Sequence, residues 1–436
     1  NTVFQANGNN TSDYPIYAWG ANTVITLTNN SFVANARQRV LFGSGLFSTQ
    51  DVTLWPQTGL EAYELTADLT IPTGITLTVA PGITVMSRAN VELRTEGYLE
   101  AIGTPSQPIT FTSATNSGGN QWSGLVFEGT AGEGNGNLNY VTVRYGGDAN
   151  SLNTACNASG LGFNIGVRNV LTGTVHIQNS TLRSAYYLCN AYDANDYGLY
   201  VEESRVIVDN TLFQANGRNT SDYALHVLGV NSELTLTGNS FVSNQRNRVL
   251  LAPGALTGSD FALVDETGLE SYELTADFTI PAGITMTVEP GVMVMGRSGV
   301  ELRTEGHLEA IGTPTQPITF TSATNTSNNQ WAGLVFEGTA GGGTGHLRYA
   351  TVRYGGNVNS LNSACNASGR GFNIGVRNVL NGEVRLENSL LRTAAYLCNA
   401  YQAANHNLYV ENSHVTVLNT AFTNNGSSTG DYSVYV

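Results

Sequence analysis

The sequence repeats itself at a constant interval of 209 residues, and this repetition constrains the fold more than any other feature. Asn-Thr-x-Phe begins at Asn1, at Asn210 and again at Asn419, and Trp122 recurs as Trp331. Internal repeats determine architecture, so we expect an array of equivalent modules. The expected boundaries are 1–209 for the first module, 210–418 for the second and 419–436 for the first coil of a third, all in one continuous solenoid.

Short runs of alternating apolar and polar residues follow one another along each module. Examples lie at 75–79, 91–93 and 141–143, bounded by turns that contain Gly or Pro. β-Branched residues at a period of two are typical of strands, and no helical stripe of useful length is present. The runs recur about every 20 to 30 residues, the size of one solenoid coil. A sandwich or a propeller is the alternative, because both also place strands at regular spacing.

Asn side chains precede several of the apolar strand residues. Asn179, Asn210 and Asn239 are each followed closely by Leu or Phe. Stacked coils would place these Asn residues at one corner, where side-chain amides can hydrogen-bond from coil to coil. This recurrence favours the solenoid.

The segment 71–127 indicates one particular fold. It reads Ile-Pro-Thr-Gly-Ile-Thr-Leu-Thr-Val at 71–79 and continues through 99–104, 108–113 and 122–127. It resembles the right-handed parallel β-helix (pectin-lyase-like) repeats of bacterial secreted and cell-surface proteins. The resemblance implies an all-β, right-handed parallel β-helix with three parallel sheets around a dry core. This fold hosts lyases, hydrolases, adhesins and stalks alike, so it predicts structure better than function.

Composition excludes several classes of function. The chain has 33 acidic and 19 basic residues, and every basic residue is Arg. The absence of Lys excludes Schiff-base chemistry and phosphate-loop lysines. An acidic surface without a basic run disfavours nucleic acid and anionic membranes as partners. No apolar run approaches the length of a membrane span, so the sequence predicts no membrane insertion.

Four cysteines form two pairs, one in each module, with the same separation of 33 residues. Zinc is the rival interpretation, but the close ligand spacing that zinc sites use is missing. A disulfide within each module is the better prediction and implies an oxidising, extracellular environment. The predicted bonds are Cys156 to Cys189 and Cys365 to Cys398. Sequons for candidate glycosylation occur at Asn10, Asn157, Asn219, Asn325 and Asn366.

Carboxylates in the first module are the strongest candidates for catalysis or metal binding. Polysaccharide lyases and hydrolases need clustered carboxylates, or an Arg or Lys base beside them. Asp193 and Asp196 are close in sequence, and Asp148 can join them only if the long loop expected at 146–173 folds back. Solvated loop acids are the alternative. The equivalent positions in the second module hold Asn357, Gln402 and Asn405.

Other polar patterns are weaker indications. Glu92, Arg94 and Glu96 share one face of a strand, and we favour an exposed charge ladder over a ligand clamp. Arg144 and Tyr145 end a strand beside the long loop, where a sugar could stack. The histidines show no metal spacing and no triad partner in the sequence. Thr arrays of the kind that bind ice occur in only a few coils.

The repeats, together with the missing catalytic pattern, favour a structural function. We predict a secreted or cell-surface β-helical rod that serves as a stalk, sheath or filament, is not an enzyme and uses no cofactor or metal. Both ends of the chain have the same coil pattern and no cap, so we expect head-to-tail association with an axial repeat near about 40 Å. Carbohydrate is a further candidate partner. The alternative function is a polysaccharide lyase or hydrolase, or a carbohydrate-binding module, of the same fold.

Overall fold

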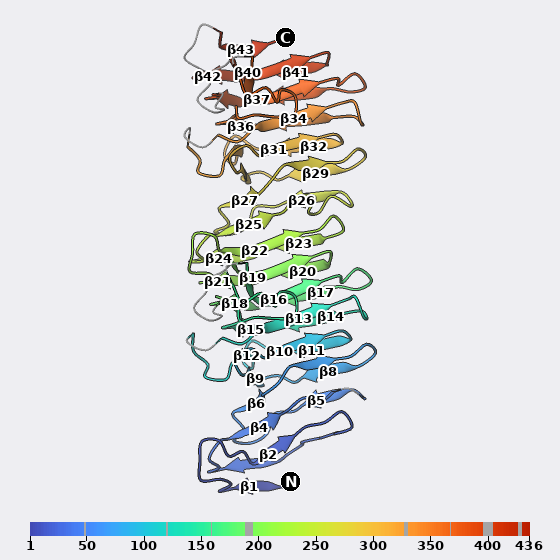
Figure 1. The fold of residues 1–436 in the computed structure, drawn as a ribbon, viewed down its shortest axis with the longest axis vertical. Coiled ribbons are helices and arrows are strands. Elements are labelled where there is room, and N and C mark those ends of the chain that lie inside the picture. The colour runs from blue at the N-terminus through green and yellow to red at the C-terminus, as the bar shows by residue number, and fades with distance from the viewer. Residues whose placement is uncertain are drawn as a thin grey trace. The chain divides into compact units, whose positions relative to one another are not determined.

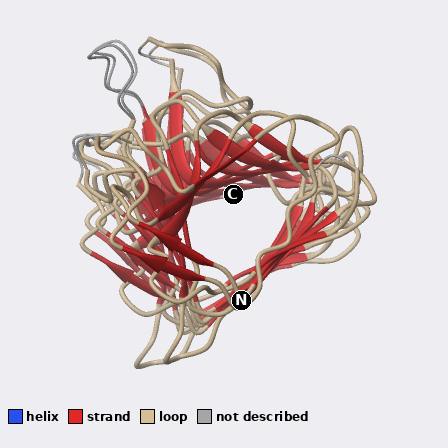
Figure 2. Cartoon of the chain, turned by 90° about the horizontal axis from the view of Figure 1, so that it is seen from below, coloured by secondary structure: helices blue, strands red, loops and turns tan. Residues whose placement is uncertain are grey.

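The computed structural model describes residues 1–47, 49–118, 121–157, 159–187, 195–326, 330–366, 368–395, 404–425 and 430–436. Within these ranges all regular structure is β-strand (Figure 2). The chain forms two compact units. Unit 1 comprises Asn1–His226, Ser232–Asn247 and Glu266–Gly268, and unit 2 comprises Val227–Asn231, Arg248–Asp265 and Leu269–Val436. The repeat boundaries expected after residues 209 and 418, and their continuity in one solenoid, stay predictions.

Successive strands of unit 1 contribute in turn to three parallel sheets, in which each strand stacks on its equivalent one coil away (Figure 1). Sheet 1a contains β5 (Val52–Leu54), β8 (Thr76–Val79), β11 (Tyr98–Ile102), β14 (Asn135–Asn139), β17 (Val175–Gln178), β20 (Arg205–Asp209) and β23 (Glu233–Thr237). Sheet 1b contains β2 (Ile16–Ala18), β4 (Arg39–Phe42), β6 (Ala62–Leu65), β9 (Thr84–Ser87), β12 (Ile109–Ser113), β15 (Val141–Arg144), β18 (Thr181–Arg183), β21 (Leu212–Gln214) and β24 (Ser240–Val242). Sheet 1c contains β7 (Leu69–Ile71), β10 (Glu92–Thr95), β13 (Gly124–Glu128), β16 (Leu161–Arg168) and β19 (Asn195–Glu202). β1 (Val3–Gln5) pairs separately with β3 (Ser31–Val33), and β22 (Tyr223–Leu228) spans the point where unit 1 gives way to unit 2.

Unit 2 is built in the same way, and its sheets are lettered by their equivalents in unit 1. Sheet 2a contains β26 (Phe261–Leu263), β29 (Thr285–Val288), β32 (His307–Ile311), β35 (Thr344–Arg348), β38 (Val384–Glu387) and β41 (Val415–Leu418). Sheet 2b contains β25 (Arg248–Leu251), β27 (Ser271–Leu274), β30 (Met293–Gly296), β33 (Ile318–Ser322), β36 (Ala350–Arg353), β39 (Leu390–Arg392) and β42 (Ala421–Thr423). Sheet 2c contains β28 (Phe278–Ile280), β31 (Glu301–Thr304), β34 (Gly333–Glu337), β37 (Arg370–Arg377), β40 (Ala404–Glu411) and β43 (Tyr432–Tyr435).

Alternation of side chains explains why these segments become strands around a core. In β11 Leu99 and Ala101 are buried, whereas Glu100 between them faces outward. The parallel register places Leu99 beside Leu77 and Ala101 beside Val79 of the neighbouring strand. Burying a Leu or Val side chain contributes about 1.5 to 3 kcal/mol, so each stacked row stabilises the coil. Parallel sheets of this kind confirm the all-β, parallel β-helix fold class.

The predicted Asn corner is present with one difference. Asn179 and Asn210 adopt left-handed backbone conformations, and the Asn179 side-chain amide donates to Asn139 Oδ1 at 2.9 Å. In the next coil Gly238 takes the left-handed position instead, and Asn239 follows it as a fully buried residue whose Oδ1 accepts from the Thr211 backbone. Gly tolerates this conformation because it has no Cβ atom. The Asn of this coil therefore stands one residue later than in the other two.

The expected long loop at 146–173 is shorter than the sequence suggested. Residues 161–168 form β16, a strand of sheet 1c, so the excursion ends before it. The apolar residues Phe163, Ile165 and Val167 are all buried, which is why this stretch returns to the coil.

No helix among the described residues combines the length and the apolar character that crossing a membrane would require.

Candidate functional site

The outer face of sheet 2a carries rows of polar side chains that the parallel register brings into line. Glu309 of β32 lies beside His346 of β35, and His346 lies beside Arg385 of β38. A second row places Arg348 beside Glu387. Alternate residues of a strand point the same way, so all five side chains project from the same face. Titratable groups are therefore concentrated along the direction in which the strands stack.

His346 lies between two carboxylates. Its Nε2 atom is 3.4 Å from Glu387 Oε2, and its Nδ1 atom is 3.8 Å from Glu309 Oε1. Glu309 also pairs with His307, whose Nε2 atom lies 3.0 Å from Glu309 Oε2. The His346 side chain is 29% exposed, so a ligand can reach it. An imidazole placed in this way is within reach of a ligand, and the adjacent carboxylates can orient its ring.

Glu387 is held in its ionised form. Arg385 contacts Glu387 Oε1 at 2.5 Å. This hydrogen bond from Arg385 is the main reason why the pKa of Glu387 lies below its usual value, and the hydrogen bond from His346 acts in the same direction. Glu387 is therefore an acceptor at neutral pH, able to orient His346 or to stabilise positive charge next to it.

Unit 1 has a related group on the equivalent sheet 1a. His176 Nε2 lies 2.7 Å from Asp209 Oδ2, and its Nδ1 atom lies 2.7 Å from Gln178 Nε2. The register places His176 beside Asn137, which in turn lies beside Glu100. Asn137 occupies the position that His346 has in unit 2. Both units thus present an imidazole and a carboxylate on this face, at different positions.

The sequence showed no metal spacing and no triad partner for the histidines, and it did not reveal that His346 and His176 each contact a carboxylate of a neighbouring coil. His346 and Glu387 are 41 residues apart, and His176 and Asp209 are 33 residues apart. Each separation is about the length of one full coil, including its loops, so no local sequence motif reveals the pairs. Knowledge of the register between neighbouring coils would have identified them, because parallel pairing brings outward-facing residues of neighbouring strands together.

The predicted carboxylate site is only partly within the described residues. Asp193 lies outside them. Asp148 and Asp196 are buried and accept hydrogen bonds from backbone amides, Asp148 from Asn90 and Asp196 from Tyr187. Burial raises the pKa of Asp148. These contacts show that the two carboxylates hold loops in place and are not solvated loop acids.

The predicted exposed charge ladder of Glu92, Arg94 and Glu96 is wrong in one respect. Glu92 is only 5% exposed, because the loop after β15 folds over it. Glu92 Oε2 accepts from the Ser151 backbone at 2.8 Å, and Arg94 donates to Ser151 Oγ at 2.8 Å. Arg94 also pairs with Glu96 at 2.8 Å. The triplet therefore anchors the loop on sheet 1c.

Neither Cys156 nor Cys365 is a free thiol. Their expected partners Cys189 and Cys398 lie outside the described residues, so the pairing stays a prediction.

Glycosylation at the sequons also stays a prediction. Asn10, Asn157 and Asn366 are exposed, and Asn219 and Asn325 are half-buried. Among the described residues no group of three or more His, Cys, Asp or Glu side chains is arranged to hold a metal ion.

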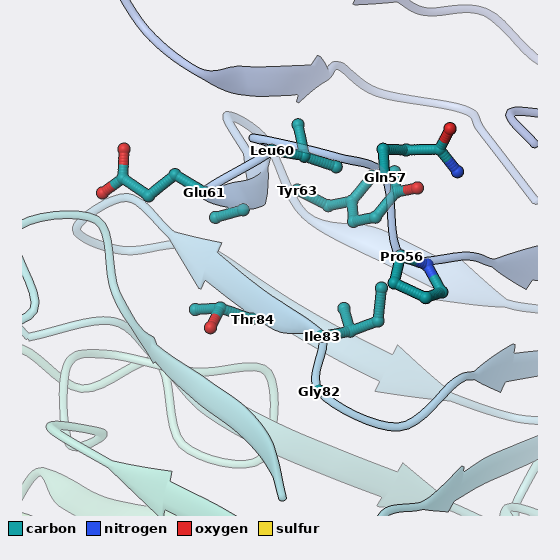
Figure 3. A pocket seen from close by; sticks show the side chains of 9 residues that line it. Pro56, Gln57, Leu60, Glu61, Tyr63, Gly82, Ile83 and Thr84 are labelled. Carbon is teal, nitrogen blue, oxygen red and sulfur yellow. The ribbon is translucent and has the colours of Figure 1, made fainter. Parts of the chain in front are cut away.

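A cavity of about 130 Å³ lies at the corner of unit 1 where β6 and β9 begin (Figure 3). Leu60, Ile83 and the ring of Tyr63 line it, and the Tyr63 hydroxyl donates to the Trp55 carbonyl. The equivalent space in unit 2 is about 10 Å³ and is lined by Met293 where unit 1 has Thr84. The two spaces differ in both volume and lining, so we assign no ligand to this cavity.

Comparison with known families identifies the class of protein that this fold represents. The sequence model of the pectate-lyase-like β-helix domain matches residues 45–163 and 261–366, which together make up more than half of the chain. The chain belongs to this family of β-helix proteins. No match was found among curated proteins or among solved structures.

This family assignment corrects the prediction that the protein is not an enzyme. That prediction rested on the missing catalytic pattern in the sequence. The match to a pectate-lyase-like domain instead points toward polysaccharide lyases and hydrolases, and the described residues of sheet 2a supply a group of acid and base side chains that the sequence did not reveal.

Proposed function

We propose that the protein binds a polysaccharide along the outer face of sheet 2a and cleaves it by acid–base chemistry. The single observation that carries this proposal is the position of His346 between Glu309 and Glu387 on an accessible sheet face of a pectate-lyase-like β-helix. Neighbouring strands are about 4.8 Å apart, which is close to the length of one pyranose unit in a chain. A glycan running along the stacking direction would meet a new row of polar side chains at each strand.

Hydrolysis fits this group of side chains better than β-elimination. Elimination requires a cation that neutralises a uronate carboxylate next to the proton that is removed. Arg385 is already paired with Glu387 and with Glu383. The carboxylates of Glu309 and Glu387 on this face also disfavour an anionic glycan as its substrate, because like charges repel. We therefore propose a neutral polysaccharide, with His346 and the adjacent carboxylates activating water or protonating the leaving oxygen.

Release of reducing ends from neutral and acidic polysaccharides, with and without calcium, tests the proposal. His346→Ala should lower the rate about 10²-fold or more, because it removes the group that transfers the proton. Asn137→Ala is the matched control, since Asn137 holds the equivalent position in unit 1, and it should leave the rate unchanged. Equal rates for the wild-type protein and His346→Ala, or unsaturated products from an acidic glycan alone, would contradict the proposal.

A structural function on the cell exterior is a second proposal. Buried Asn side chains favour it, because they join coils of unit 1 into a ladder: Asn164 donates to Asn216 at 3.1 Å, and Asn216 donates to Asn244 at 2.8 Å. Such ladders stiffen stacked coils, which suits a stalk, sheath or filament. Binding to an insoluble polysaccharide without cleavage, measured by co-sedimentation, would favour this proposal over catalysis.

A further inference from the structure

Two pairs of arginines, one on sheet 1b and one on sheet 2b, have no counter-ion among the described residues, and neither pair belongs to the site on sheet 2a. Arg144 of β15 lies directly beside Arg183 of β18, and Arg353 of β36 lies directly beside Arg392 of β39. The two pairs occupy equivalent positions of the 209-residue repeat. The same like-charged arrangement thus occurs once in each unit.

Most other arginines in this acidic protein have carboxylate partners, which makes these pairs unusual. Arg168 and Arg248, for example, contact Glu128 at 2.6 Å and Glu273 at 2.8 Å. In contrast, the Nε atoms of all four paired arginines are buried without any hydrogen-bond partner. Within the described part of the chain no carboxylate forms an ion pair with any of the four.

For the second pair, the undescribed residues of the second half of the chain supply no counter-ion either. Residues 327–329, 367, 396–403 and 426–429 contain no Asp or Glu. No acidic residue in these parts of the chain can therefore neutralise Arg353 and Arg392.

The immediate surroundings of each pair disfavour its positive charge. Burial, followed by the charge of Arg183, lowers the pKa of the Arg144 guanidinium. Burial, followed by the charge of Arg392, likewise lowers the pKa of the Arg353 guanidinium. Arg144 is further fixed by Trp122, whose buried indole donates to the Arg144 carbonyl at 2.9 Å. The position is therefore maintained although it brings two like charges together.

We propose that each arginine pair binds a tetrahedral oxyanion, such as a sulfate or phosphate group. Guanidinium groups on adjacent strands lie at two levels about 4.8 Å apart. A tetrahedral anion can offer separate oxygens to both levels, whereas a planar carboxylate matches one guanidinium fork. The group is either the free ion or an ester on a glycan, since both have the same chemistry. This proposal goes beyond the proposed function and does not depend on it.

Isothermal titration calorimetry of the full chain with inorganic sulfate and inorganic phosphate tests the proposal. We expect two anions to bind per chain, one at each pair. Arg353→Gln/Arg392→Gln should reduce the stoichiometry to one, and adding Arg144→Gln/Arg183→Gln should abolish binding. Arg205→Gln is the control, because Arg205 is exposed and already paired with Glu233 at 2.7 Å, and it should retain both sites. No saturable binding by the wild-type protein, or unchanged binding by the fourfold variant, would overturn the proposal.

Two further ligands, a monosaccharide sulfate ester and glucuronate, identify the source and the shape of the group. Binding of a monosaccharide sulfate ester at least as tight as that of sulfate supports a glycan ester, and binding of the free ions alone supports an inorganic ligand. Glucuronate that binds more tightly than sulfate at the same stoichiometry would overturn the tetrahedral assignment.

Thermal unfolding separates binding from a structural role. In buffer without sulfate or phosphate, the melting temperature of Arg353→Gln/Arg392→Gln should be equal to or above that of the wild-type protein, because the substitution removes repulsion. Low concentrations of sulfate should then raise the melting temperature of the wild-type protein more than that of this variant, which keeps the Arg144–Arg183 pair, and should not raise that of the fourfold variant. A variant that melts well below the wild-type protein without anions would show that the arginines stabilise the fold, and would contradict the proposal.

Discussion

Glu64 shows how a single buried carboxylate organises one region of sheet 1b. Its side chain is 1% exposed and contacts Arg39 at 2.9 Å, Arg88 at 3.0 Å and the Tyr14 hydroxyl at 2.8 Å. Burial acts to raise the pKa of Glu64, but the hydrogen bonds from these three groups outweigh it and hold the pKa below its usual value. Glu64 is therefore charged in the folded protein and links residues from several coils.

Glu64→Gln should destabilise the protein by about 3 kcal/mol, because it leaves the surrounding guanidinium groups without their shared counter-charge. Equilibrium unfolding in urea measures this loss. Glu61→Gln is the control: Glu61 pairs with the same Arg39, but its side chain is 48% exposed, so we expect a loss below about 1 kcal/mol.

The effect of Glu64→Gln also depends on pH. The folded-state pKa of Glu64 is depressed, so its stabilising contribution is complete above the unfolded pKa near about 4.3 and is lost as the pH falls through the folded value. The difference between the wild-type protein and the variant should therefore narrow in acid. A difference that grows as the pH falls below 4 would contradict this assignment.

At the scale of elements, the loop between β15 and β16 lies outside the strand ladders and is held largely by hydrogen bonds that involve side chains. Glu92 accepts from Ser151, Asp148 accepts from Asn90, and the Tyr187 hydroxyl donates to the Ala155 carbonyl at 2.6 Å. The coils below it have continuous ladders of backbone hydrogen bonds. The loop should therefore open at a lower free energy than the strands that it covers.

The predicted disulfide between Cys156 and Cys189 should reinforce this loop, and reduction should release it before the coils unfold. Closing a loop of about 30 residues contributes about 3 to 4 kcal/mol in the chain-entropy model. Hydrogen exchange with and without reductant should show faster exchange at 149–157, with little change in β13 and β15. Intact mass gives the direct test, and four free thiols in the unreduced protein would refute both predicted disulfides.

At the scale of the whole molecule, head-to-tail association stays a prediction. Within each unit, successive coils stack through parallel strand pairing. The end surfaces of two equivalent modules should therefore be able to pair in the same way. Such heterologous contacts do not close and propagate as filaments. Electron microscopy should show fibres with an axial repeat near about 40 Å or a small multiple, from about 4.8 Å per coil. Discrete particles at all concentrations would contradict it.

The sequence by itself predicted strands and turns throughout, from the alternation within runs, and its resemblance to β-helix repeats favoured the parallel β-helix over a sandwich or a propeller. It also located the strands of segment 71–127 and the Asn corner at Asn179 and Asn210. Only the tertiary structure decided which outward-facing residues meet. His346 reaches Glu387, and Arg353 meets Arg392, through the register of strands that are separated by a whole coil. Loop lengths differ from coil to coil, so residues that pair across neighbouring coils are not separated by a constant number of residues. The candidate site therefore follows only from the pairing of the stacked strands.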